Sequence, residues 1–90
     1  MRHTSIKAYY EILPKIGARQ RQVLEALSSG PKTNRQISKM TGLEVNAVTP
    51  RTNELVKLGL VSSRGVIVDP ESNKSVTVWS MVGEQLEMNL

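Results

Sequence analysis

The chain has 90 residues, with 12 Lys or Arg, 8 Asp or Glu, one histidine and no cysteine. A chain of this length can build only one hydrophobic core, which excludes a two-domain organisation. Without cysteine there is neither a disulfide framework nor a thiolate metal site, and the single His3 lies near the start of the chain. These counts exclude structural zinc, and no metal or other cofactor is expected.

The large apolar residues are mostly aliphatic, because the sequence contains no Phe, one Trp and two Tyr. Such a composition favours helices packed with a small sheet, which is the α+β class with mainly α structure. No segment approaches the apolar length of a membrane span or of a signal peptide. We therefore expect a cytoplasmic protein, close to the nucleoid or, for a phage-encoded chain, in the host cytoplasm.

Positive charge is concentrated in the first two thirds of the chain. Residues 1–65 hold eleven Lys and Arg against four acids, whereas residues 66–90 hold one Lys against four acids. A basic surface on the helical part attracts phosphate, although ordinary solvation accounts for a charge of this size equally well.

Residues 1–90 are predicted to form a single domain that begins with two helices. The first covers residues 4–13, with Thr4 or Ser5 as the N-cap, and ends at Pro14. The second starts at Ala18, and its apolar residues recur at helical spacing until the break at 28–31.

A third helix is predicted to start at Thr33, because Thr33 and Gln36 have the spacing of a capping box. Ile37 and Met40 would supply its buried side, and Gly42 can adopt the left-handed conformation that ends a helix. The helical core then spans residues 18–58, with a helix-turn-helix at 33–58.

The fourth helix is predicted over residues 45–58, with a buried stripe made of Val48, Thr52, Leu55 and Leu58. Pro50 allows two starts for this helix. Either the helix begins near Val45 and contains Pro50 just beyond its first turn, or Thr49 is the N-cap and Pro50 takes the first helical position.

After Gly59 the apolar period changes to two, which predicts a hairpin over residues 60–82 with a polar turn at 69–74. Trp79 has a strand position beside the helices, so we expect it to pack rather than to stack on bases. Residues 83–90 form a short acidic tail to which no function is assigned.

The third and fourth helices carry a family resemblance. A small residue at Ser38, a tight turn at Gly42 and apolar residues on either side suit two crossing helices. The segments 36–43 and 46–61 resemble winged-helix regulators of the MarR-like kind and short phage or bacterial helix-turn-helix proteins, over about residues 18–81. The resemblance implies a three-helix core, a recognition helix in the major groove of duplex DNA, and a hairpin wing over the adjacent backbone.

Polar side chains on the outer face of the fourth helix are the candidates for reading bases. Asn46 and Asn53 can pair with an adenine edge, and Thr49 offers a hydroxyl and a methyl group beside Pro50. An ordinary solvated helix face explains each of them singly, and their position on the second helix of this motif favours the base-reading role.

A second set of residues is expected to contact the DNA backbone. At the start of the third helix, free amides and a positive dipole end would favour phosphate. Arg51 could reach DNA or could instead pair with Glu54 or Glu44. The hairpin departs from the family pattern, because Asp69 and Glu71 at its tip repel phosphate and leave only a weak contact or none. The complete set is Lys32, Thr33, Asn34, Arg35, Arg51, Lys57, Arg64 and Lys74.

Two other functions were weighed against DNA binding. An enzyme is disfavoured, because the acids are scattered, the only histidine is near the start, and no glycine-rich phosphate loop follows a strand. The alternative is a winged helix used as a protein-interaction module in a replication or transcription assembly, which the acidic hairpin and tail support. The apolar first helix also suits a homodimer.

Overall fold

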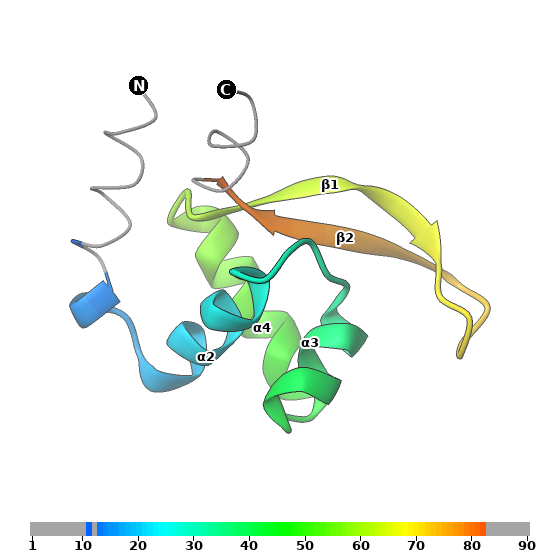
Figure 1. The fold of residues 1–90 in the computed structure, drawn as a ribbon, viewed down its shortest axis with the longest axis horizontal. Coiled ribbons are helices and arrows are strands. Elements are labelled where there is room, and N and C mark those ends of the chain that lie inside the picture. The colour runs from blue at the N-terminus through cyan, green and yellow to red at the C-terminus, as the bar shows by residue number, and fades with distance from the viewer. Residues whose placement is uncertain (1–10, 12, 83–90) are drawn as a thin grey trace.

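The computed structural model describes residue 11 and residues 13–82. The elements are a 3-10 helix η1 (Leu13–Lys15), helices α2 (Ala18–Leu27), α3 (Asn34–Thr41) and α4 (Val45–Lys57), and strands β1 (Val61–Val68) and β2 (Ser75–Met81). Almost all of the predicted first helix and all of the tail lie outside the described residues. The α+β class, the helical core and the C-terminal hairpin are as expected (Figure 1).

Helix α2 is amphipathic and forms the centre of the core. Val23, Leu24 and Leu27 are fully buried and Ala26 nearly so, whereas the polar residues between them are exposed. This is the pattern of a helix that buries one stripe against neighbouring elements.

The predicted capping box of α3 is present. The backbone amide of Thr33 donates to Gln36 Oε1 at 2.9 Å, and the backbone amide of Gln36 donates to the Thr33 hydroxyl at 3.2 Å. Gly42 closes the helix with φ of 80°, a left-handed conformation that glycine adopts without a Cβ clash. Leu43 then packs back on the core.

Helix α4 begins at Val45 with Glu44 as its N-cap, so Pro50 lies inside the helix. The alternative start with Thr49 as the N-cap was therefore wrong. Pro50 has no amide hydrogen, so the carbonyl four residues earlier, that of Asn46, lacks its usual helical donor.

Two residues predicted to be buried are exposed. Met40, in the last turn of α3, is 57% exposed, and Leu58, just after α4, is 46% exposed. The helical period placed both on the correct stripe, but each lies at the end of its helix, beyond the elements that cover Ile37 and Leu55. Three residues of the α4 stripe, Val48, Thr52 and Leu55, are fully buried as predicted.

The hairpin is antiparallel, with Val61 opposite Met81 and Val68 opposite Ser75. Its register shifts between Ser63 and Gly65, which marks a β-bulge that bends the strand. A bridge that the sequence did not predict joins β2 to the α2–α3 loop, since Lys32 and Trp79 exchange backbone hydrogen bonds of 2.9 and 2.8 Å.

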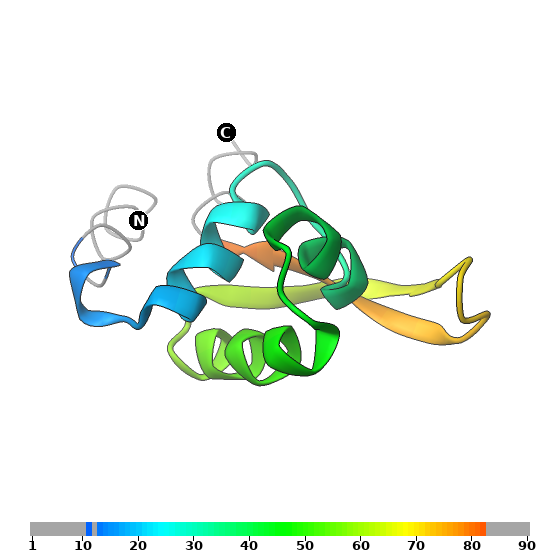
Figure 2. The ribbon, with the colours of Figure 1, turned by 90° about the horizontal axis from the view of Figure 1, so that it is seen from below.

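The helices pack in one layer against the open end of the hairpin, where β1 begins and β2 ends. The half of the hairpin that carries the turn extends beyond the helices (Figure 1). Val61 and Met81 complete the core that α2, α3 and α4 form, and Trp79 packs against it as expected. Seen from below, α4 runs along one flank of this layer, with α2 and α3 on the other (Figure 2). Among the described helices, none has the length and apolar character needed to cross a bilayer.

Candidate nucleic-acid interface

The outer face of α4 is polar and open. Asn46, Pro50, Asn53 and Lys57 are exposed and recur at spacings of three and four residues, so they share one side of the helix. That side is opposite the buried stripe of Val48, Thr52 and Leu55. The predicted base-contacting side chains are therefore accessible, apart from Thr49, which is half-buried.

A groove of about 440 Å³ runs beside this face, between the start of α3, the first half of α4 and the hairpin. The structure brings several predicted contact residues together here, from three separate parts of the chain. They are Thr33, Asn34, Arg35, Thr49, Asn53 and Lys74.

Asn34 links α3 to α4 at the floor of this groove. Its Oδ1 accepts from the buried Thr52 hydroxyl at 2.9 Å, and its Nδ2 donates to Thr49 Oγ1 at 3.4 Å. The Thr49 hydroxyl itself donates to the carbonyl of Val45 at 3.1 Å. Asn34 and Thr49 thus use polar atoms to hold the two helices together, and the Thr49 methyl group is the part left for a ligand.

Arg51 faces away from the groove and pairs with Glu54, one of the two partners predicted for it. Its Nε and Nη2 donate to the two Glu54 carboxylate oxygens at 2.8 and 2.9 Å, and Gln20 of α2 donates to the same carboxylate at 2.9 Å. The hydrogen bond from Arg51, followed by the one from Gln20, lowers the pKa of Glu54. The hydrogen bond to Glu54 in turn raises the pKa of Arg51. Glu54 therefore links α4 to α2 through Gln20, and Arg51 holds the Glu54 carboxylate from within α4.

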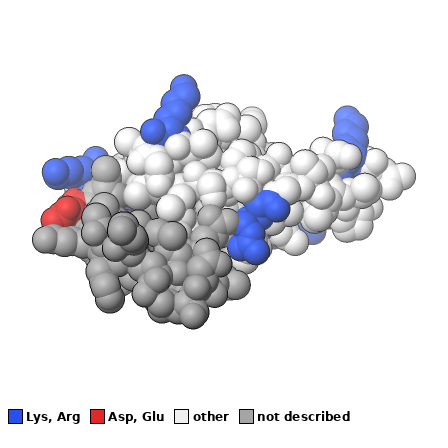
Figure 3. Space-filling model, turned by 90° about the horizontal axis from the view of Figure 1, so that it is seen from above, with Lys and Arg blue, Asp and Glu red and all other residues white. Residues whose placement is uncertain are grey.

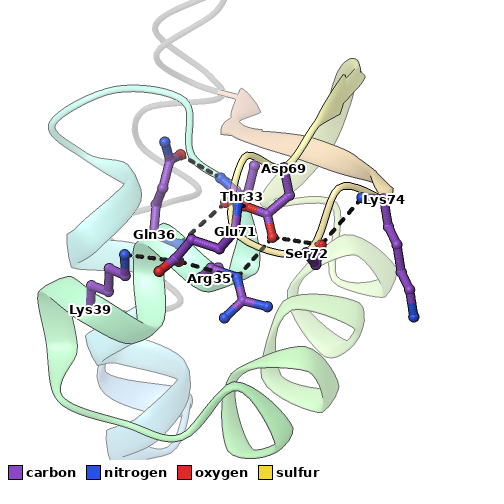
Figure 4. Close-up of polar contacts among 8 residues, drawn as sticks. All are labelled: Thr33, Arg35, Gln36, Lys39, Asp69, Glu71, Ser72 and Lys74. Atoms are coloured by element: carbon purple, nitrogen blue, oxygen red, sulfur yellow. Dashed lines mark hydrogen bonds and ion pairs between the residues drawn. The ribbon is translucent and has the colours of Figure 1, made fainter.

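The hairpin tip is attached to α3 through Asp69, which is 6% exposed. Its Oδ2 accepts from the Ser72 hydroxyl at 2.8 Å and from Arg35 Nε at 2.9 Å. The hydrogen bond from Ser72, with that of Arg35 and the backbone amide of Glu71, lowers the pKa of Asp69. One carboxylate thus organises the turn and also joins it to α3 (Figure 4).

Glu71, also at the tip, contacts two cations of α3. Its Oε2 lies 2.9 Å from Lys39 Nζ and 3.5 Å from Arg35 Nε. The sequence reasoning did not select Lys39, although its place four residues after Arg35 puts both on one face of α3. The acidic tip is therefore paired with the helix, and Lys74 points away from it (Figure 4).

No protein-family model matches the chain, and no curated protein is similar to it in sequence. Solved structures match it in shape. A possible transcriptional regulator from Methanosarcina mazei is 10% identical, with a TM-score of 0.66 over 93% of this chain and 71% of its own. The homodimeric winged helix-turn-helix DNA-binding domain of a possible ArsR-family regulator from Mycobacterium bovis is 19% identical, with a TM-score of 0.62 over 98% of this chain and 77% of its own. Diamide-treated YodB from B. subtilis is 17% identical, with a TM-score of 0.60 over 89% of this chain and 79% of its own.

This chain has the winged helix-turn-helix fold. Within the fold, α3 and α4 are the two helices of the helix-turn-helix, and β1 with β2 is the wing.

The residues predicted to contact the DNA backbone differ in how far their side chains are already used within the protein. Lys32 Nζ donates to Ser29 Oγ at 2.6 Å and to the Gly30 carbonyl at 3.2 Å, so it is held by the α2–α3 loop. Thr33 is 4% exposed and uses its hydroxyl in the capping box. Arg64, at the bulge of β1, and Lys74, at the wing tip, are exposed.

Figure 3 shows the surface of the wing that is turned away from the helices. On its described part, the Lys and Arg side chains stand apart from one another and form no continuous basic patch (Figure 3). Over the described residues there is also no group of three or more His, Asp or Glu side chains that could hold a metal ion.

Proposed function

We propose that this winged helix binds duplex DNA as a transcriptional regulator, with α4 in the major groove. The observation that carries the proposal is the accessible polar face of α4, on the second helix of a helix-turn-helix and beside a groove that ends at the wing. Solved structures described as transcriptional regulators, one of them as a DNA-binding domain, share this fold.

The proposed base contacts come from the exposed face of α4. Asn46 and Asn53 have free amide groups that can donate to and accept from an adenine edge. Thr49 and Pro50 offer apolar atoms suited to a thymine methyl group. Lys57, at the end of the helix, is placed for a phosphate.

Most of the proposed backbone contacts come from the start of α3 and from the wing. Arg35, Arg64 and Lys74 are cations with side chains at least partly open to solvent. Thr33 and Asn34 would act through the amides at the start of α3, because their side chains are already used within the protein. Lys32, Arg35 and Arg51 each have a partner within the protein that would have to be given up for such a contact.

We further propose that the protein acts as a homodimer through its first helix and in the cytoplasm, where it meets genomic DNA. The similar domain from Mycobacterium bovis is homodimeric. A two-fold dimer would place two α4 helices about one helical turn of DNA apart, roughly 34 Å, and would require a palindromic site. The proposed function includes no catalytic step.

The test is a salt titration of binding to random-sequence duplex DNA, followed by selection of bound sequences from a random pool. A regulator should bind at low salt, weaken steeply as salt rises, and enrich one motif, with the mass of the complex giving the number of chains bound. No binding to any duplex at low salt would overturn the proposal and leave the protein-interaction module as the alternative.

A further inference from the structure

Arg35 and Lys39 form a pair of cations on one face of α3, next to the groove. They are four residues apart, and their side chains are 41% and 64% exposed. Two cations at this spacing can bind one anionic oxygen group between them. In this structure the group they bind is the Glu71 carboxylate from the wing tip.

The two acids of the wing tip are held very differently. The Asp69 side chain is 8% exposed and is fixed by Ser72 and by the turn backbone as well as by Arg35. The Glu71 side chain is 47% exposed, and it is held by two ion pairs with α3. An exposed ion pair is weak and is screened by salt, so Glu71 can be displaced while Asp69 stays in place.

We infer that Arg35 and Lys39 are a phosphate-binding pair, and that Glu71 occupies this pair in the free protein as a stand-in for a DNA phosphate. The inference rests on the proposed DNA binding. The carboxylate presents its oxygen to the same two cations that a backbone phosphate would contact, and Arg35 also lines the groove beside α4. A DNA phosphate must then displace the Glu71 carboxylate from these cations. This competition lowers the affinity of the protein for DNA.

Replacing the competing carboxylate by a neutral amide should strengthen DNA binding. Glu71→Gln removes the carboxylate charge from beside Lys39 and Arg35 at nearly constant side-chain size, while Arg35 keeps its ion pair with Asp69. One added phosphate contact corresponds to about three- to ten-fold tighter binding at about 0.1 M salt, and to a salt slope steeper by about 0.9. A purely structural role for Glu71, holding the wing in position, predicts weaker binding instead.

The experiment measures binding of the full chain to one selected duplex over a range of salt concentrations. Glu25→Gln, on the exposed side of α2 and away from the groove, makes the same change in net charge and serves as the matched control. Far from the groove its effect should be below about two-fold at 0.1 M salt, because charges beyond a Debye length are screened. The inference requires Glu71→Gln to exceed Glu25→Gln in both affinity gain and slope.

A second variant ties the gain to the named cation. Lys39→Gln should remove most of the gain from Glu71→Gln when the two are combined, and on its own should weaken binding to all duplexes to a similar degree. An affinity gain that persists in full in the double variant would overturn the assignment of Lys39.

The results separate the two levels of the hypothesis. If wild-type protein binds DNA but Glu71→Gln binds equally or more weakly, the inference is wrong and the proposed function stands. If neither protein binds any duplex at low salt, the proposed function is wrong and the inference falls with it.

Discussion

The side-chain carbonyl of Asn34, in the first turn of α3, accepts a 2.9 Å hydrogen bond from the buried hydroxyl of Thr52 on α4. The contact fixes the angle between the two helices of the helix-turn-helix from within. Thr52 is fully buried, so its hydroxyl depends on protein partners, here Asn34 and the carbonyl of Val48 at 3.2 Å.

We expect Asn34→Ala and Thr52→Val each to lower the free energy of unfolding by about 1 kcal/mol, the usual net value of one hydrogen bond. The double variant should lose less than the sum, with a coupling of about 0.5 to 1.5 kcal/mol, because both changes remove the same contact. Urea denaturation followed by circular dichroism measures all four proteins. Additive losses would show that the bond contributes nothing to stability.

Features of the fold that depend on neighbouring residues could be predicted from the sequence. The capping box of Thr33 and Gln36 and the left-handed Gly42 involve residues within one turn of each other, so residue type and spacing were sufficient. The buried stripe of α4 followed in the same way from its period. Exposure at the helix ends could not be predicted, because a helical wheel shows on which side of the helix a residue lies but not where the covering element ends. Met40 is the example.

Contacts between distant segments were outside the reach of this reasoning. Arg35 and Asp69 are 34 residues apart, and their pairing depends on how far the wing bends back, which the bulge near Gly65 influences. From the sequence alone, Asp69 and Glu71 were therefore predicted to be unpaired acids that repel phosphate. Their pairing with α3 also explains why Lys39 was missed, since its importance depends on Glu71.

Asn53→Ala should reduce discrimination at one base pair of the selected site by about 1 to 3 kcal/mol, while binding to unrelated DNA changes little. Asn53 is exposed on α4 and borders the groove, so its loss removes an amide without disturbing the core. Affinities for the site and for its single-base variants measure the effect. Gln22→Ala, an exposed amide on α2, is the matched control and should leave discrimination intact. An unchanged preference in the Asn53 variant would exclude it from base reading.

Lys57→Ala should weaken binding to all duplexes alike and reduce the salt slope by about 0.9, the value for one phosphate contact. Lys57 is exposed at the end of α4, where an ammonium group recognises charge and not base identity. The matched control is Lys15→Ala, an exposed lysine in η1, outside the groove and the α4 face. Equal changes in salt slope for the two variants would mean that the slope reports the net charge of the protein and not a phosphate contact made by Lys57.

Stability should fall as the pH drops below about 5, because the pKa of Asp69 and that of Glu54 are lowered in the folded protein. A carboxyl with a lowered folded pKa stabilises the protein fully above its unfolded pKa, about 4, and this stabilisation disappears as the pH falls through the folded value. Melting temperatures from pH 7 to pH 3 should therefore fall less steeply for Asp69→Asn than for wild type, and least for Asp69→Asn combined with Glu54→Gln. An identical slope in all three proteins would contradict the roles given to these carboxylates.

Pro50 lies inside α4 on its exposed side, so replacing it should separate the stability of the domain from its proposed function. Pro50→Ala restores an amide donor to the carbonyl of Asn46 and removes the ring that crowds it, which should raise the free energy of unfolding by about 1 to 3 kcal/mol. The same variant loses an apolar contact proposed for a thymine methyl group, so affinity for the selected site should fall although the protein is more stable. Urea denaturation and binding measured on the same preparation test the gain in stability and the loss of affinity, with Asn53→Ala as the control, for stability alone, for changing an exposed residue of α4 to alanine. A less stable Pro50→Ala protein would show that the ring makes packing contacts which its exposed position does not predict.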